Sequence, residues 1–164
     1  MASRLENAID AIQDEFQNIT TANGYRNDLA THQVIRTIRH PGQITTHPEI
    51  GVQPIDEEWE AFDGKRTLFN AIVTIRVAGR VKPYIDLTPD AVKMQESIDS
   101  LVHDMNKIMA AMLTKYKVDS TSPWLVLGGD WKVTRNTHLA PMFGWGEVVL
   151  TFKILLRNVT TSFD

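Results

Sequence analysis

The N-terminal segment has apolar residues at helical spacing. Steps of four and three along this stretch predict one apolar stripe on an amphipathic helix. The stripe consists of Leu5, Ile9, Ile12, Phe16 and Ile19. Ser3 and Glu6 match a capping box at the start of this helix. Asn23 and Gly24 predict its C-cap, after which Tyr25 folds back onto the apolar stripe at Ile19 or Phe16.

A second, longer helix is predicted from the segment 86–117. Thr88 has the position of an N-cap, and Pro89 that of the first helical residue. Apolar side chains recur on one side of this helix, so we expect that side to face the core. They are Ile98, Leu101, Val102, Met105, Ile108, Met109, Met112 and Tyr116.

Alternating apolar and polar residues predict the strands. We expect extended segments at 33–42, 49–54, 66–79, 124–135 and 147–158. The clearest alternation places Phe69, Ala71, Val73, Ile75 and Val77 on one face of one strand, and Val148, Leu150, Phe152, Ile154 and Leu156 on one face of another. Gly128 and Gly129 interrupt the strand at 124–135, which predicts a bulge, a sharp bend or a hairpin.

The order of these elements predicts an α+β fold. We expect one domain over residues 1–164, with a short N-terminal helix and a long central helix on one face of a mostly antiparallel sheet. A chain of 164 residues is long enough to bury one sizeable core without disulfides, and it contains no cysteine.

Two segments do not fit this core, 54–66 and 136–147. Both have loop-like sequences, and large aromatic residues in loops either fold back onto the core or contact a partner. The aromatic residues are Trp59, Phe62, Phe143 and Trp145. The first segment also holds the densest acidic group, whose spacing differs from that of a calcium-binding loop and predicts a solvated loop. This group consists of Asp56, Glu57, Glu58, Glu60 and Asp63.

The composition disfavours nucleic-acid-binding and membrane-spanning proteins. The net charge of −3 disfavours nucleic-acid binding as the main task, and no apolar run is long enough to span a membrane. The first residues lack the apolar core of a signal peptide, so we expect an intracellular location.

Candidate chemistry is sparse. The five histidines show no metal-ligand spacing, although His40 and His47 flank a Pro-Gly turn and could meet in space. No nucleophile motif or phosphate-binding loop is present, so we expect no enzyme and no cofactor.

Several segments together resemble the tail terminator, or tail completion, proteins of long-tailed bacteriophages. They are "ITTANGYRND", "VIRTIRHPG", "PEIGVQP", "NAIVTIRVAG", "DLTPDAVKMQESIDSLVHDMNKIM" and "GEVVLTFKILLRN", and they extend over nearly the whole chain. The resemblance implies an α+β subunit of a hexameric ring on the finished tail tube. Such a ring stops tube polymerisation and offers a surface to the head.

The implied partners are further copies of the chain, the tail tube protein and a head-completion or neck protein, in the virion and, during assembly, in the host cytoplasm. DNA would pass without specific binding, and an acidic lumen loop would repel its phosphates. The alternatives are another neck or minor tail protein or, from a different class, a ligand-binding or enzymatic domain. The site of such a domain would form between Gly128-Gly129-Asp130 and the loop with His138.

Overall fold

The computed structural model describes residues 3–61, 68–82, 91–117, 124–140 and 143–160. Its elements are α1 (Arg4–Gln17), β1 (Val34–Ile35), β2 (Glu49–Ala61), β3 (Leu68–Val81), α2 (Ala91–Lys115), β4 (Leu125–Ala140) and β5 (Phe143–Thr160). Three 3-10 turns complete them: η1 (Thr21–Asn23), η2 (Thr31–Gln33) and η3 (Pro41–Gln43).

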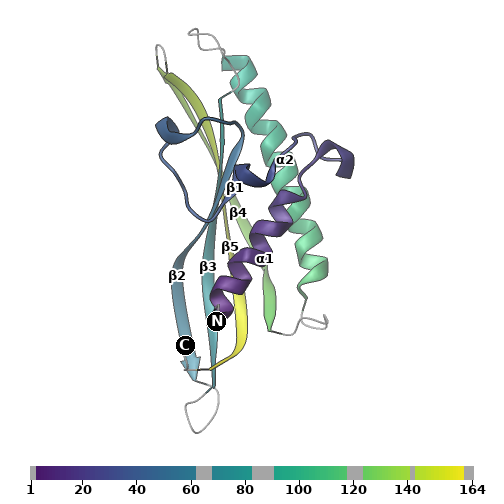
Figure 1. Ribbon diagram of the computed structural model, residues 1–164, viewed down its shortest axis with the longest axis vertical. Helices are drawn as coiled ribbons and strands as arrows, with labels where there is room; N and C mark the ends of the chain where they lie inside the picture. Colours follow the sequence, from purple (N-terminus) through teal and green to yellow (C-terminus); the bar gives the residue numbers. More distant parts are fainter. Residues whose placement is uncertain (1–2, 62–67, 83–90, 118–123, 141–142, 161–164) are drawn as a thin grey trace.

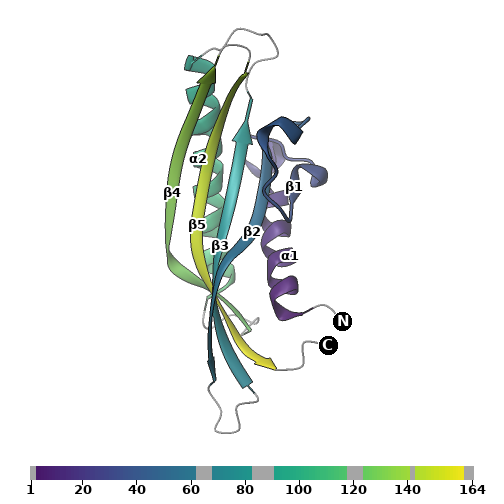
Figure 2. The ribbon, with the colours of Figure 1, turned by 90° about the vertical axis from the view of Figure 1, so that its left-hand side faces the viewer.

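One five-stranded sheet has the strand order β1-β2-β3-β5-β4. Only β1 and β2 are parallel, and the other pairs are antiparallel. Figures 1 and 2 show both helices on the same side of this sheet. The α+β fold with a short and a long helix on one face is therefore confirmed.

Helix α1 begins as predicted but ends earlier. Ser3 and Glu6 form the capping box, with the Glu6 N–H donating to Ser3 Oγ at 3.2 Å and the Ser3 N–H donating to Glu6 Oε2 at 2.7 Å. The helix ends at Gln17, and a new turn, η1, starts because the Thr20 hydroxyl accepts the N–H of Asn23. Gly24 does adopt the left-handed conformation, at φ 80°, but it ends η1 and is not the cap of α1.

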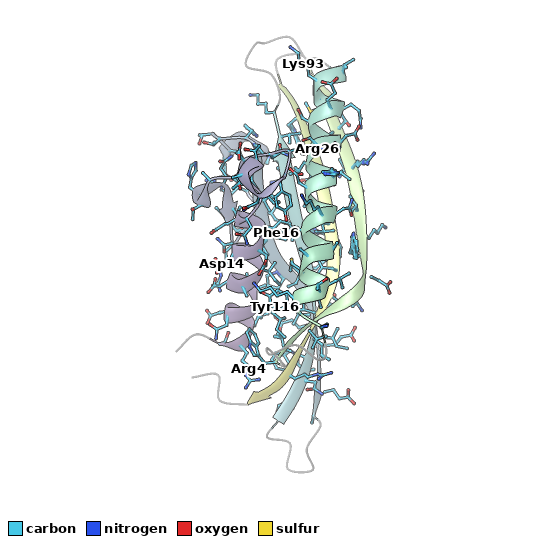
Figure 3. All side chains as sticks on the ribbon, turned by 90° about the vertical axis from the view of Figure 1, so that its right-hand side faces the viewer. Arg4, Asp14, Phe16, Arg26, Lys93 and Tyr116 are labelled. Atoms are coloured by element: carbon cyan, nitrogen blue, oxygen red, sulfur yellow. The ribbon has the colours of Figure 1, made fainter. Side chains whose placement is uncertain are left out.

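The apolar side of α2 is buried as predicted: Ile98, Leu101, Val102, Met105, Ile108, Met109, Met112 and Tyr116 all belong to the core. The predicted caps Thr88 and Pro89 lie outside the described residues. Figure 3 shows Phe16 and Tyr116 on the sides of α1 and α2 that face each other. Buried Glu15 joins the helices, since its carboxylate accepts from the Tyr116 hydroxyl at 3.0 Å and pairs with Lys115.

The first predicted strand, at 33–42, is only two residues long. Side-chain bonds direct the rest of this segment into a loop, because Gln33 Nε2 donates to the Pro48 carbonyl and Arg39 pairs with Glu49. The predicted piece at 49–54 is instead the start of the 13-residue strand β2. A register shift after Pro54 accommodates the proline.

Both segments that we predicted as loops are mostly strand. Residues 54–61 pair with β3, and residues 136–140 pair with 143–147 as the end of the β4–β5 hairpin. Gly146 lies beneath α2, where an added Cβ would approach Ile98 to 2.7 Å. The glycine that suggested a loop therefore allows close packing of helix and sheet.

The Gly128-Gly129 pair is a bulge, one of the alternatives that we predicted. The register of β4 against β5 shifts between Leu127 and Trp131, and the strand then continues to Ala140. The predicted core faces of β3 and β5 are confirmed from Ala71 to Val77 and from Val148 to Leu156, where alternate residues are buried. Phe69, predicted on the same face of β3, is only half-buried.

Candidate functional site

The face of the sheet opposite the helices, here called the open face, is covered by neither of the described helices (Figure 2). The strand register aligns Glu58, Ile72, Leu155 and Val126 in one row across it. Ile72 is 39% exposed, and a shallow depression of about 260 Å³ lies among Ile72, Val126 and Leu155. The open face thus holds an accessible apolar row.

The prediction that the acidic group lies in a loop is wrong, because its first four carboxylates lie on β2. Asp56, Glu58 and Glu60 pair with open-face residues of β3, whereas Glu57 lies on the other side of the strand. All four are exposed. The sequence suggested a loop because this part of β2 has no buried face to require alternating apolar residues. Asp63 lies outside the described residues.

Basic side chains share the open face with these carboxylates. In the strand register, Arg76 lies opposite Thr151, and Thr151 lies opposite Lys132. Lys153 lies opposite Thr74 in the next row. Arg76, Lys132 and Lys153 are all exposed. The open face therefore carries both signs of charge, with the carboxylates towards β2 and the basic groups towards β3, β5 and β4.

Two edges of the sheet lack a neighbouring strand among the described residues. Strand β1 covers β2 only at Ile50 and Gly51, so β2 from Val52 onward pairs on one side only. Strand β4, from Leu125 to Ala140, is the edge at the other side of the sheet, although its Leu127 N–H donates to the Tyr116 carbonyl at 2.9 Å. Elsewhere such edges present backbone N–H and C=O groups that no neighbouring strand pairs.

The two tryptophans among the predicted interface aromatics are far apart. Trp59 lies on β2, is 40% exposed, and donates through Nε1 to Glu57 Oε2 at 3.1 Å. Trp145 lies half-buried on β5, opposite His138. Trp59 lies opposite Ala71 of β3, and Gly146, next to Trp145, lies opposite Val81 of the same strand. About 30 Å of strand β3 therefore separates the two tryptophans. Phe143 has its backbone on β5 and its side chain outside the described part, where Phe62 also lies.

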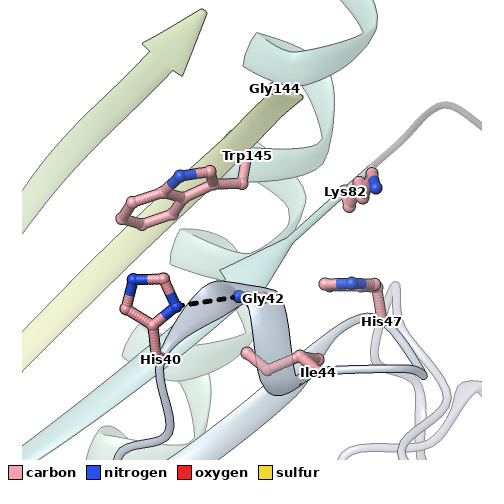
Figure 4. A pocket seen from close by; sticks show the side chains of 7 residues that line it. All are labelled: His40, Gly42, Ile44, His47, Lys82, Gly144 and Trp145. Carbon is pink, nitrogen blue, oxygen red and sulfur yellow. Dashed lines mark hydrogen bonds between the residues drawn. The ribbon is translucent and has the colours of Figure 1, made fainter. Parts of the chain in front are cut away.

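A cleft of about 380 Å³ lies where β3 ends and β5 begins (Figure 4). It brings together side chains that the sequence separates widely: His40, Gly42, Ile44, His47, Lys82, Gly144 and Trp145. The two histidines that flank the Pro-Gly turn do line one cavity. The spacing of His40 and His47 around the turn indicated that they could lie close together, whereas no sequence pattern indicated Lys82.

Two arginine–carboxylate pairs flank this cleft. Arg80 pairs with Glu147 at 2.8 Å, and its guanidinium lies 5.7 Å from the ring centroid of Trp145. Arg39 pairs with Glu49, whose side chain is largely buried. Burial lowers the pKa of His47, and the Lys82 ammonium acts in the same direction, while the carbonyls of Arg80 and Ile44 and the Glu49 carboxylate oppose the shift. The His47 ring is therefore neutral near pH 7.

The structure does not form the alternative ligand site between Gly128-Gly129-Asp130 and His138. The glycine bulge borders a separate depression with Lys132 and Lys153, while His138 pairs with Trp145 at the far end of β4. Within the described residues, no group of three His, Asp or Glu side chains is arranged to hold a metal ion. None of the helices described is long and apolar enough to cross a membrane.

No protein-family model matches the chain, and no curated protein matches it either.

Proposed function

We propose that this chain is a structural protein of a phage virion, a tail terminator that assembles into a closed ring on the tail tube. The observation that carries the proposal is the pair of sheet edges, on opposite sides of the subunit, that have no neighbouring strand among the described residues. A ring built from one chain needs two different, complementary patches joined head to tail until the rotation closes. The proposed ring has six copies of the chain. Its proposed partners are those that the resemblance implies, the tube protein and a head-completion or neck protein.

Charge distinguishes the two edges. From Val52 onward β2 carries four carboxylates, Asp56, Glu57, Glu58 and Glu60, and no basic residue. Strand β4 carries Lys132 and Arg135 against one carboxylate, Asp130. Opposite charges across an interface steer association and fix the register, and like charges disfavour wrong pairings. In the proposed ring, the β2 edge of one subunit lies against the β4 edge of the next.

Trp59 supports the same contact. Its indole is partly exposed on the acidic strand, and large aromatic residues within an interface typically contribute most of its energy. In this arrangement the open face lines the passage for DNA. Its carboxylates repel phosphates locally, and its basic groups offset them, so that DNA is not held.

A charge exchange tests the contact. One variant carries Glu57→Lys and Glu58→Lys on β2, and a second carries Lys132→Glu and Arg135→Glu on β4. We expect each variant to keep its fold by circular dichroism and to lose assembly in sedimentation, because like charges then meet. A one-to-one mixture of the two variants should assemble, because every contact between unlike variants is complementary in an alternating ring of six. The single chain with both pairs exchanged should recover assembly as well.

The matched control is Lys153→Glu, a charge reversal on β5, which has strands on both sides. It should leave assembly unchanged. Assembly that survives both pair reversals, or that fails to return in the chain with all four changes, would refute the edge contact.

A further inference from the structure

The cleft between the η3 turn and the start of β5 has two kinds of wall. Trp145 and buried Ile44 contribute apolar surface, and exposed His40 and Lys82 contribute polar groups. Figure 4 shows these side chains around one space, with the His40 ring and the Trp145 indole on the same side of it. An apolar wall with a few polar groups is the usual composition of a binding site, and about 380 Å³ is enough for one or two side chains.

Counting the described residues alone, the charge at the cleft is positive. Within this part of the chain two carboxylates lie next to it, Glu49 and Glu147, and each is neutralised by an arginine. Among the described residues Lys82 has no carboxylate partner within ion-pairing distance. An exposed ammonium group beside neutralised carboxylates is available to an incoming anion.

His40 adds a directed donor. Its Nδ1 accepts the N–H of Gly42 at 3.2 Å (Figure 4). A neutral imidazole that accepts at Nδ1 carries its proton on Nε2, so the other nitrogen of the ring is a hydrogen-bond donor. In Figure 4 this second nitrogen lies on the side of the ring away from Gly42.

We propose that this cleft binds an acidic segment of a partner protein, with carboxylate side chains meeting Lys82 and His40 on opposite sides of the cleft and an apolar part resting on Trp145. A single lysine with an imidazole donor suits carboxylates better than a phosphate, since phosphate sites generally use arginine forks, several cations or a helix N-terminus. The cleft also lies at the opposite end of β3 from the acidic part of β2. It is therefore a surface separate from the proposed ring contact. A negative result for the cleft does not contradict the ring, and a negative result for the ring does not contradict the cleft.

The test uses the full chain labelled with 5-fluorotryptophan and observed by fluorine NMR. The Trp145 resonance is assigned from a Trp145→Phe variant. The probe is N-acetylated, C-amidated hexaglutamate, compared with hexaglutamine of the same length and with inorganic phosphate.

We expect hexaglutamate to shift the Trp145 resonance saturably and hexaglutamine to leave it in place. Lys82→Gln should weaken the apparent affinity about fivefold or more, because it removes the charge from a charge-assisted hydrogen bond. Lys153→Gln, which removes an exposed lysine from β5, is the matched control and should bind the probe as the parent chain does.

Three results would overturn the proposal. They are a Trp145 resonance that hexaglutamate does not move, an equal response to hexaglutamine, and an affinity that Lys82→Gln leaves unchanged. A shift produced by phosphate but not by hexaglutamate would also refute a carboxylate site and would assign the cleft to phosphate.

Discussion

Asp104 of α2 holds Asn27 through two hydrogen bonds. Its Oδ2 accepts the backbone N–H and the Nδ2–H of Asn27, both at 2.8 Å, and the carboxylate also accepts the N–H of Arg26 at 2.9 Å. The Asp104 side chain is fully buried. This contact fixes the chain after η1 against the long helix, 77 residues further along the sequence.

Asp104→Ala should lower the free energy of unfolding by about 2 to 4 kcal/mol, because it leaves backbone N–H groups without an acceptor. Asp99→Ala on the same helix is the control, since the exposed Asp99–Arg135 pair at 3.3 Å contributes about 1 kcal/mol or less. Urea denaturation measures both. Equal losses for the two variants would contradict the role assigned to Asp104.

Phe152→Ala should cost about 3 to 5 kcal/mol, since it removes a large ring from the helix-covered face of β5. Phe152 is only 2% exposed. Its neighbour Lys153 points to the open face, so Lys153→Ala should change the unfolding free energy by about 0.5 kcal/mol or less. A loss below about 1 kcal/mol for Phe152→Ala would mean that the face assignment of β5 is wrong.

Gly24→Val should destabilise the domain by about 1 to 2 kcal/mol, because a β-branched residue tolerates the left-handed conformation poorly. The added side chain would also meet Lys107 Nζ, which donates to the Gly24 carbonyl at 2.7 Å. Gly129→Ala is the control, as an added Cβ there has no heavy atom within 4 Å. If thermal melts show the same midpoint for Gly24→Val and the parent chain, Gly24 does not require this conformation.

His47 makes stability depend on pH. Its pKa in the folded chain lies below the ordinary value of 6.5, chiefly because of burial. As the pH falls through that value, the unfolded chain binds the proton more readily, and the folded chain loses stability. Between about pH 7.5 and about pH 5.5, His47→Gln should therefore lose less stability than the parent. Parallel slopes of stability against pH for the two proteins would contradict this prediction.

The elements that pack against each other were predictable from the sequence. Residues such as Ile98 and Met105 on α2 and Leu150 and Phe152 on β5 are all buried on one side. Burial on one face imposes the period of the element on the sequence. The capping box at Ser3 and Glu6 was predictable because the residues that form it are three positions apart.

The ends of the strands and the cleft were not predictable in the same way. Beyond the helices β2 has no core to face, so the acidic run to Glu60 lost the alternation that identifies a strand. At Gly144 and Gly146, within the segment 136–147, the sequence suggested a loop, although both residues lie buried in β5. The cleft joins His40, Lys82 and Trp145 from three separate elements, and only the tertiary fold brings them together.

The proposed function depends most on the formation of a closed ring. Negative-stain electron microscopy of the purified full chain, with sedimentation velocity on the same samples over a range of concentrations, tests it directly. We predict ring-shaped particles of six subunits, with a mass of about six times 18.6 kDa. Monomers or compact dimers at every concentration would contradict the proposed terminator and would favour a ligand-binding domain.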